Sequence, residues 1–185
     1  AGHSTKVALY AVAIGSELGF STEELDLLRV AAILHDYGKI GVSDSVLKKE
    51  GLLDDEEFAE MKRHASLTED ILTRIYFTRK YRNVPLIAAS HHERLDGGGY
   101  PRGATAREIP FMAKILTVAD VFEALTADRR YRKKMSTDDA LAILDAGAGT
   151  RFDGHVISAL RRHLAVPEPL VAKAPPVENY RTGGR

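Results

Sequence analysis

Five of the seven histidines are spaced as ligands of one shared metal site would be in a helical protein. They are His3, His35, His64, His91 and His92. The first four follow one another at intervals of about 30 residues, roughly one helix plus its return connection. Successive helices of a bundle can therefore each deliver an imidazole to a common point, as bundles do when they build metal sites from facing helices.

Two aspartates lie within or at the end of apolar segments, where burying a carboxylate costs free energy. Asp36 follows His35 at the end of an apolar segment, and Asp120 interrupts the apolar run ILTVADVFEAL. Such a carboxylate is costly unless it is paired or bound to a metal. Both members of the pair His35–Asp36 can serve one cluster if Asp36 lies between two metals and His35 caps one of them. The pair His91–His92 could do the same from the opposite wall.

A single buried histidine is more often a hydrogen-bonded core residue than a ligand, and this applies to His64 taken alone. We interpret His155 and His163, in the last predicted helix, in that ordinary way. The joint pattern of His-Asp, His, His-His and a buried Asp is different, because so many unpaired buried polar groups would be very costly. The set as a whole therefore indicates a metal centre.

Composition limits the chemistry of this centre. The chain has 185 residues, 26 Lys+Arg, 26 Asp+Glu and no Cys, so its formal net charge is zero. Neutrality argues against a general binder of DNA or RNA, which needs clustered, unneutralised cations. Without thiolates the ligands must be imidazole and carboxylate, which suit iron, manganese or zinc better than copper(I) or an iron–sulfur cluster.

Basic residues gather close to the predicted centre. The run DRRYRKK at 128–134 begins roughly two helical turns past Asp120 and could clamp a phosphate, although such runs are usually solvated faces. Lys39 lies one turn past His35. The glycine-rich segment DGGGYP at 96–101, by composition an ordinary surface loop, directly follows the histidine pair and would lie over the site. Metals with a cationic rim indicate phosphoester hydrolysis as a class.

Periodicity and capping signals predict an all-α, single-domain helical bundle with a buried His/Asp metal centre. Helix starts are indicated by Ser21 with Glu24, by the acidic cluster DDEE at 54–57 and by Ser136 with Asp139. The second helix is apolar almost all round near its end and should be central. The expected helices cover 3–18, 21 to Gly38 or Gly41, 54 to about 80 with breaks, 84–94, 112–127, 136–144 and 153–164, with a helical turn within 42–53 and irregular chain at 95–110.

Domain limits follow from the same patterns. We expect the catalytic domain at residues 1–165 and a Pro-rich, poorly ordered tail at 166–185. No apolar run reaches the roughly 18 residues of a transmembrane helix, and no signal peptide is evident. Because the chain opens at Ala1 rather than Met, we expect it to be a piece of something longer.

Several motifs together make the chain similar to the HD-GYP family, a subgroup of the HD superfamily of metal-dependent phosphohydrolases. They are HDYGKIGV at 35–42, the isolated His64, HHERLDGGGYP at 91–101, VADVFEALT at 118–126 and DRRYR at 128–132. The match runs in the family's order and spacing from residue 3 to about residue 165. It implies a bacterial, cytoplasmic phosphodiesterase that degrades the second messenger cyclic di-GMP to pGpG or GMP.

The resemblance also implies roles for individual residues. The implied metal ligands are His3, His35, Asp36, His64, His91, His92 and Asp120, with Asp36 bridging and His3 serving where a third metal is present. Lys39 would contact the scissile phosphate, and Arg129 and Arg132 would hold the phosphates and guanine. Gly99, Tyr100 and Pro101 are the namesake triplet, in a loop beside the site that could bind substrate or a partner.

The resemblance implies two or three divalent metal ions, iron or manganese first, with zinc, nickel or magnesium as alternatives in a purified sample. A hydroxide bridging two metals would attack the phosphorus, with Lys39 and the arginines stabilising the developing charge. The implied partners are cyclic di-GMP, a receiver, sensor or GGDEF-type regulatory domain or protein acting through the GYP loop, and a second copy in a homodimer.

Three departures from the family pattern matter. A Glu that trinuclear members place one turn before the first His would fall upstream of Ala1. Arg130 replaces the usual Pro of the R-P-Y-R segment, which would alter the guanine side of the pocket. Ala65 follows His64 where a Pro is usual, and Leu67–Thr68 replace a small residue, which we expect to change helix geometry without losing the ligand.

Two alternative functions stay open. One is a catalytically weak or inactive module that binds cyclic di-GMP or a protein, which the complete ligand set disfavours. The other is an HD phosphohydrolase of another nucleotide, such as a different cyclic dinucleotide, which the GYP triplet disfavours and a substrate panel would decide.

Overall fold

The structure is a computed structural model that describes residues 2–128 and 134–164. Within these residues the chain forms helices and no strand, which confirms the all-α prediction. Eight α-helices and two short 3₁₀ helices follow one another in this part of the chain. They are α1 (His3–Glu17), α2 (Thr22–Leu34), η1 (Tyr37–Gly41), α3 (Asp44–Leu47), α4 (Asp55–Leu72), η2 (Arg79–Tyr81), α5 (Val84–Ala89), α6 (Phe111–Thr126), α7 (Thr137–Ala146) and α8 (Gly154–His163).

The predicted helix starts are confirmed by their caps. The Ser21 hydroxyl accepts the Glu24 amide while the Glu24 carboxylate accepts the Ser21 amide, a reciprocal box that satisfies two otherwise unpaired donors. Asp54 and Glu57 form the same box at the start of α4. At α7 the Ser136 hydroxyl accepts the Asp139 amide.

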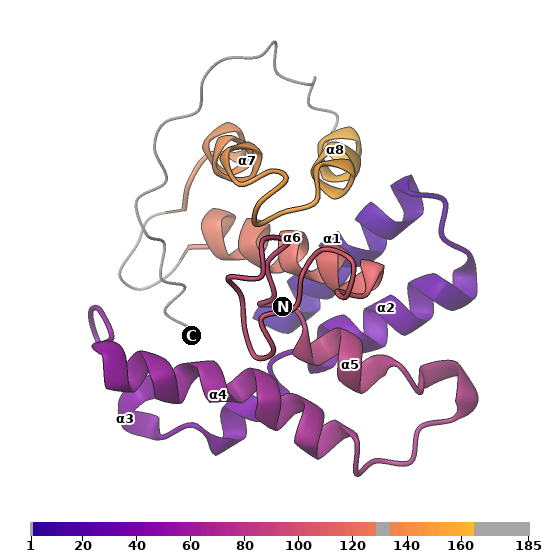
Figure 1. Cartoon of the computed structure of the whole chain (residues 1–185). Helices are drawn as coiled ribbons and strands as arrows, with labels where there is room; N and C mark the ends of the chain where they lie inside the picture. Colours follow the sequence, from indigo (N-terminus) through magenta and orange to yellow (C-terminus); the bar gives the residue numbers. More distant parts are fainter. Residues whose placement is uncertain (1, 129–133, 165–185) are drawn as a thin grey trace.

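Helix α6 occupies the centre of the fold. It packs against α1, α7 and α8, and in Figure 1 the pair α7 and α8 lies on one side of it while α4 and α5 lie on the other. Its apolar side chains join the largest core cluster, and two acidic residues, Asp120 and Glu123, are buried with them. The predicted buried helix is therefore confirmed.

Helix α2 is less central than its composition predicts. It was expected to be buried almost all round near its end, but Ile33 is 43% exposed. Leu28, Ala31 and Ala32 are buried, and Val30 and Leu34 are only partly buried against the core. The helix also stops at Leu34, before either predicted glycine.

The stretch from 54 to about 80 is helical with a break, as predicted: α4 ends at Leu72 and η2 covers Arg79–Tyr81. Helix α5 ends earlier than predicted, at Ala89 rather than at residue 94. At α5 the His91 imidazole lies 2.6 Å from the Ala88 carbonyl oxygen, taking an acceptor that a continuing helix would offer to an amide. His91 and His92 therefore lie in a turn after the helix.

Some predictions fall outside the described residues. These are the tail at 166–185 and the proposed phosphate contacts Arg129 and Arg132. None of the helices that the structure describes combines the length and apolarity needed to span a bilayer.

Candidate metal centre

The HD motif lies in the turn between α2 and η1, pressed against α4. His35 is fully buried, and Asp36 begins the turn. A Cβ on Gly38 would come within 2.1 Å of the His64 carbonyl oxygen and 2.5 Å of the Thr68 amide nitrogen. Only glycine therefore lets this turn approach α4 closely enough to bring Asp36 next to His64.

Three buried histidines share one orientation. In each, Nδ1 lies near the carbonyl oxygen three residues earlier: 2.7 Å from Ala32 for His35, 2.6 Å from Met61 for His64 and 2.6 Å from Ala88 for His91. The proton belongs on Nδ1, because a carbonyl can only accept. Nε2 is then left as a lone pair, and this backbone contact is the kind that fixes the tautomer and direction of metal-binding imidazoles.

The two oxygens of Asp36 face different imidazoles. Oδ1 lies 3.5 Å from His64 Nε2 and 3.9 Å from His91 Nε2. Oδ2 lies 3.4 Å from His35 Nε2 and 3.7 Å from His3 Nε2. One carboxylate thus stands between two groups of nitrogen donors, as the sequence-based hypothesis of a bridging Asp36 requires.

Helices α1 and α6 complete the second group. His3 Nε2 lies 3.1 Å from Asp120 Oδ1, and His3 Nδ1 lies 2.6 Å from Glu123 Oε2. Asp120 and Glu123 are on the same face of α6 because they are three residues apart. Sequence reasoning missed Glu123; its signal was a second acidic residue inside the apolar run VADVFEAL.

The assembled ligand atoms fit a divalent metal centre. Three groups of side chains each bring three donor atoms within 4.8 Å of one another: His64, His91 and His92; His3, His35 and Asp120; His35, Asp36 and His91. His35 Nε2 is buried without a hydrogen-bond partner. A buried nitrogen lone pair aimed at carboxylates is costly unless a cation or proton satisfies it, so the donor set suits a metal.

The pKa shifts of the imidazoles differ between a first group, His64, His91 and His92, and a second group, His3 and His35. Burial lowers the pKa of His64, lowers that of His91 well below its usual range and, with the nearby His64, lowers that of His92 to about 3. Burial would also lower the pKa values of His3 and His35, but carboxylates next to them raise both. The neutral imidazole is favoured in the first group, whereas the carboxylates of the second favour the imidazolium, which must lose its Nε2 proton before that nitrogen can bind a metal.

Both aspartates remain ionised despite their surroundings. Burial would raise the pKa of Asp36, but its contact with His35 and the charges of His35 and Lys39 hold it well below the usual value. For Asp120, burial is likewise outweighed by the contact with His3 and by the neighbouring imidazoles, so its pKa is lowered. The Lys39 ammonium lies 2.6 Å from Asp36 Oδ2, at the open edge of the centre.

The loop between α5 and α6, residues 95–110, is called the GYP loop below. Tyr100 stacks on His92 with ring centroids 4.7 Å apart, and burial near Asp120 and Asp36 raises the pKa of its phenol. A Cβ on Gly99 would lie 2.4 Å from the Arg94 amide nitrogen and 2.6 Å from the His92 carbonyl oxygen, so this loop packs tightly on the histidine turn. Pro101 follows, half-buried.

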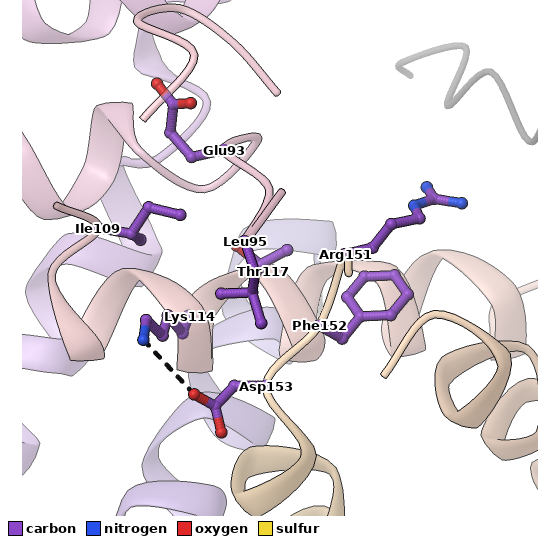
Figure 2. Close-up of a pocket in the computed structure, with 8 residues that line it drawn as sticks. All are labelled: Glu93, Leu95, Ile109, Lys114, Thr117, Arg151, Phe152 and Asp153. Carbon is purple, nitrogen blue, oxygen red and sulfur yellow. Dashed lines mark hydrogen bonds and ion pairs between the residues drawn. The ribbon is translucent and has the colours of Figure 1, made fainter. Parts of the chain in front are cut away.

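A buried glutamate anchors this loop and was not anticipated from the sequence. Glu93, 2% exposed, accepts the backbone amides of Arg102 at 2.7 Å and Ala104 at 2.8 Å. Figure 2 shows it at the rim of a small pocket in which Lys114 and Asp153 pair with each other at 3.5 Å. His155 and His163 lie on α8 and are exposed, so they are not the hydrogen-bonded core residues that the sequence-based interpretation expected.

With this geometry in place, comparison with known proteins defines the family. The profile of the HD domain matches residues 1–156. The chain belongs to the HD domain family. An HDG"Y"P protein from Bdellovibrio bacteriovorus shares the fold, with a TM-score of 0.70 over 88% of this chain and 51% of that protein, at 21% sequence identity.

Curated relatives are more similar in sequence. A 3'3'-cGAMP-specific phosphodiesterase 3 from Vibrio cholerae is 44% identical over 164 residues, which are 89% of this chain and 35% of that protein. The cyclic di-GMP phosphodiesterase response regulator RpfG from Xanthomonas campestris is 43% identical over 157 residues, 85% of this chain and 41% of that protein. This HD domain chain thus spans well under half the length of these relatives.

Proposed function

We propose that this HD domain is the catalytic unit of a metal-dependent phosphodiesterase that hydrolyses cyclic di-GMP to pGpG or GMP. The observation that carries the proposal is Asp36, whose two oxygens face two separate groups of nitrogen donors. Such an arrangement suits two divalent cations close together, the layout used for in-line displacement at phosphorus.

The ligand assignment follows the two groups. One metal would be held by His64, His91 and His92, the other by His3, His35 and Asp120, with Asp36 contributing an oxygen to each. Bound there, the metals would supply Lewis acidity and an activated water near neutral pH. Imidazole and carboxylate donors favour iron or manganese, with zinc, nickel or magnesium as alternatives. If a third ion were bound, His3 would serve that ion instead of the second metal.

The remaining residues would bind and orient the substrate. Lys39, 21% exposed at its side chain, presents an ammonium beside Asp36 that can hold a phosphate oxygen. Gly99, Tyr100 and Pro101 would form the wall of the substrate site, with the neutral phenol of Tyr100 kept against His92. From the sequence alone, Arg129 and Arg132 would bind the substrate phosphates and guanine.

A substrate panel tests the proposal. Protein purified without oxygen and loaded with Fe²⁺ or Mn²⁺ is incubated with cyclic di-GMP, and products are separated by chromatography. We expect pGpG or GMP to form, and to vanish after chelation and return on reloading. Protein that holds its metals and leaves every cyclic dinucleotide intact would instead be a binding module, which would overturn the proposal.

A second substrate is favoured by a specific observation. The relative that is 44% identical is named for 3'3'-cGAMP, a cyclic dinucleotide with one adenine in place of guanine. We therefore include 3'3'-cGAMP in the panel and compare kcat/KM for the two. A ratio above about ten in favour of 3'3'-cGAMP, some 1.4 kcal/mol of transition-state binding, would transfer the assignment to that substrate.

The relatives are longer than the region that this chain matches, which bears on its possible partners. We propose that it works in the bacterial cytoplasm beside a receiver, sensor or GGDEF-type partner that contacts the GYP loop, and that it forms a homodimer. The length of the relatives beyond the matched region supports a regulatory partner. Light scattering of the purified chain would measure the dimer, and a monomer at micromolar concentration would contradict it.

A further inference from the structure

The two histidine-bearing turns of the centre lack the support of regular helix. His35 comes directly after α2 and His91 shortly after α5, so their backbone carbonyls have no partner four residues later in the same helix. Both residues are at most 1% exposed, so water cannot supply the missing hydrogen bonds. Another helix must supply them, and whatever does so also fixes the position of the turn.

In both turns the partner is a buried threonine hydroxyl. Thr68 of α4 is fully buried; its Oγ1 donates to the His35 carbonyl oxygen at 3.0 Å and accepts the Gly38 amide at 2.9 Å. One side chain thus joins both ends of the HD turn to the helix that carries His64.

The second threonine contacts the other histidine turn, and its single hydroxyl proton lies between two carbonyl oxygens. Thr117 of α6 is 8% exposed, and its hydroxyl lies 2.8 Å from the His91 carbonyl oxygen and 2.9 Å from the Ala113 carbonyl oxygen. Figure 2 shows Thr117 on α6 beside the segment of Glu93 and Leu95 that leaves the histidine turn. The helix that carries Asp120 therefore holds the turn that carries His91 and His92.

We propose that Thr68 and Thr117 are positioning residues that set the distance between the two halves of the metal centre. Each hydroxyl ties a loop-borne histidine to the helix that bears a ligand of the facing wall: His64 for Thr68 and Asp120 for Thr117. The inference rests on the proposed metal centre and extends it to two residues that touch neither metal nor substrate.

Loss of either hydroxyl leaves a buried carbonyl unpaired. Valine has nearly the shape of threonine, so Thr68→Val or Thr117→Val removes the hydrogen bond while retaining most of the packing. The turn is then free to shift, and outer partners of metal ligands typically change metal affinity by roughly 10- to 100-fold when removed. Serine keeps the hydroxyl, so Thr68→Ser and Thr117→Ser should stay within about 3-fold of the unaltered chain.

Two less buried threonines, one on α6 and one at the C-terminal end of α4, serve as controls for the loss of a threonine hydroxyl. Thr126 of α6 bonds the Phe122 carbonyl at 2.8 Å, and Thr73, just after α4, bonds the Glu69 carbonyl at 2.8 Å. Each is the same kind of bond to a carbonyl four residues earlier, with no histidine involved. Thr126→Val and Thr73→Val therefore test for a general cost of replacing threonine by valine.

The experiment is a Co²⁺ titration of each metal-free protein, followed by visible absorption, with metal content measured after gel filtration and thermal melting of the metal-free form. We expect both valine variants to lose 10-fold or more in Co²⁺ affinity with altered absorption bands. The serine variants and the controls should match the unaltered chain. If Thr68→Val does not fold, the Thr117 pair and Thr68→Ser decide the matter.

Several results would overturn the inference. Valine variants that bind Co²⁺ with the same affinity and spectrum would show that the hydroxyls do not position the ligands, while leaving the proposed function intact. Serine variants as weak as the valine variants would assign the effect to packing. An unaltered chain that binds no Co²⁺, Mn²⁺ or Fe²⁺ would remove the metal centre itself, and the proposed function with it.

Discussion

The two halves of the centre use the same ligand type in opposite electrostatic settings. Around His64, His91 and His92 there are mainly other imidazoles, and burial keeps all three neutral. Around His3 and His35 the buried carboxylates outweigh burial and raise the imidazole pKa values. Burial alone therefore does not decide the charge of a histidine here; the number of carboxylates within reach does. We expect the two halves to differ in affinity and in their response to mutation.

Asp36 belongs to both halves, so its loss should have the largest effect. Asp36→Ala should abolish metal loading of both groups and reduce turnover by at least about 1,000-fold, since two sets of donors lose their shared oxygen. The fold should survive, because Asp36 lies at a turn and belongs to none of the three hydrophobic core clusters. Elemental analysis, product assays and circular dichroism measure the three outcomes. Hydrolysis near the unaltered rate would refute the bridging role.

Removing one ligand from each half in turn should distinguish the metal affinities of the two halves. His64→Ala should cost one equivalent of metal and roughly 100-fold in activity, because the imidazole half loses one of three nitrogen donors. His3→Ala should weaken the other half by about 10-fold only, since two carboxylates, Asp120 and Asp36, remain there, against Asp36 alone after His64→Ala. Metal content at a fixed free Mn²⁺ concentration compares the two. Equal losses from both variants would argue against two separable sites.

Glu123→Gln should affect metal binding only in the half of the centre that contains His3, His35 and Asp120. Glu123→Gln keeps an acceptor 2.6 Å from His3 Nδ1 but removes the charge that helps to raise the pKa of His3. Metal affinity should fall by up to about 10-fold at one site, as for other outer partners of ligands. A Co²⁺ titration resolves the two sites. We expect the site of His64, His91 and His92 to keep its Co²⁺ affinity while the site of His3, His35 and Asp120 is weakened. Equal weakening of both sites would contradict the placement of Glu123 beside the second site alone.

A carboxylate far from the centre provides the reference for these effects. Asp26 contacts Lys80 at 2.6 Å together with Tyr81 and Arg29, and these hydrogen bonds lower its pKa. Because the folded pKa is depressed, the stabilisation is present above the unfolded pKa and is lost as pH falls through the folded value. Asp26→Asn should lower Tm at pH 7 by only about 2 °C, with the gap closing toward pH 2. A Tm difference that grows as the pH falls would show that the pKa of Asp26 is not lowered in the folded protein.

The sequence predicted helix starts better than helix ends. Starts depend on local side-chain caps such as Ser21 with Glu24, which can be recognised over four residues. The ends of α2 and α5 depend on imidazoles that take backbone carbonyls and on turns held by other helices, such as the contact of Thr68 with His35. Those partners are remote in sequence, so no local pattern marks them.

By itself, the sequence determined the chemistry of this protein: an all-helical chain with nitrogen and oxygen donors, no thiolate, and candidate ligands spaced about one helix apart. Only the tertiary structure decided which donors belong to each half of the metal centre. It turned the two oxygens of Asp36 toward different imidazoles and brought Glu123 to His3 across the length of the chain. The physical reason is that residue types fix which bonds can form, whereas distance, burial and neighbouring charge arise only when the helices pack.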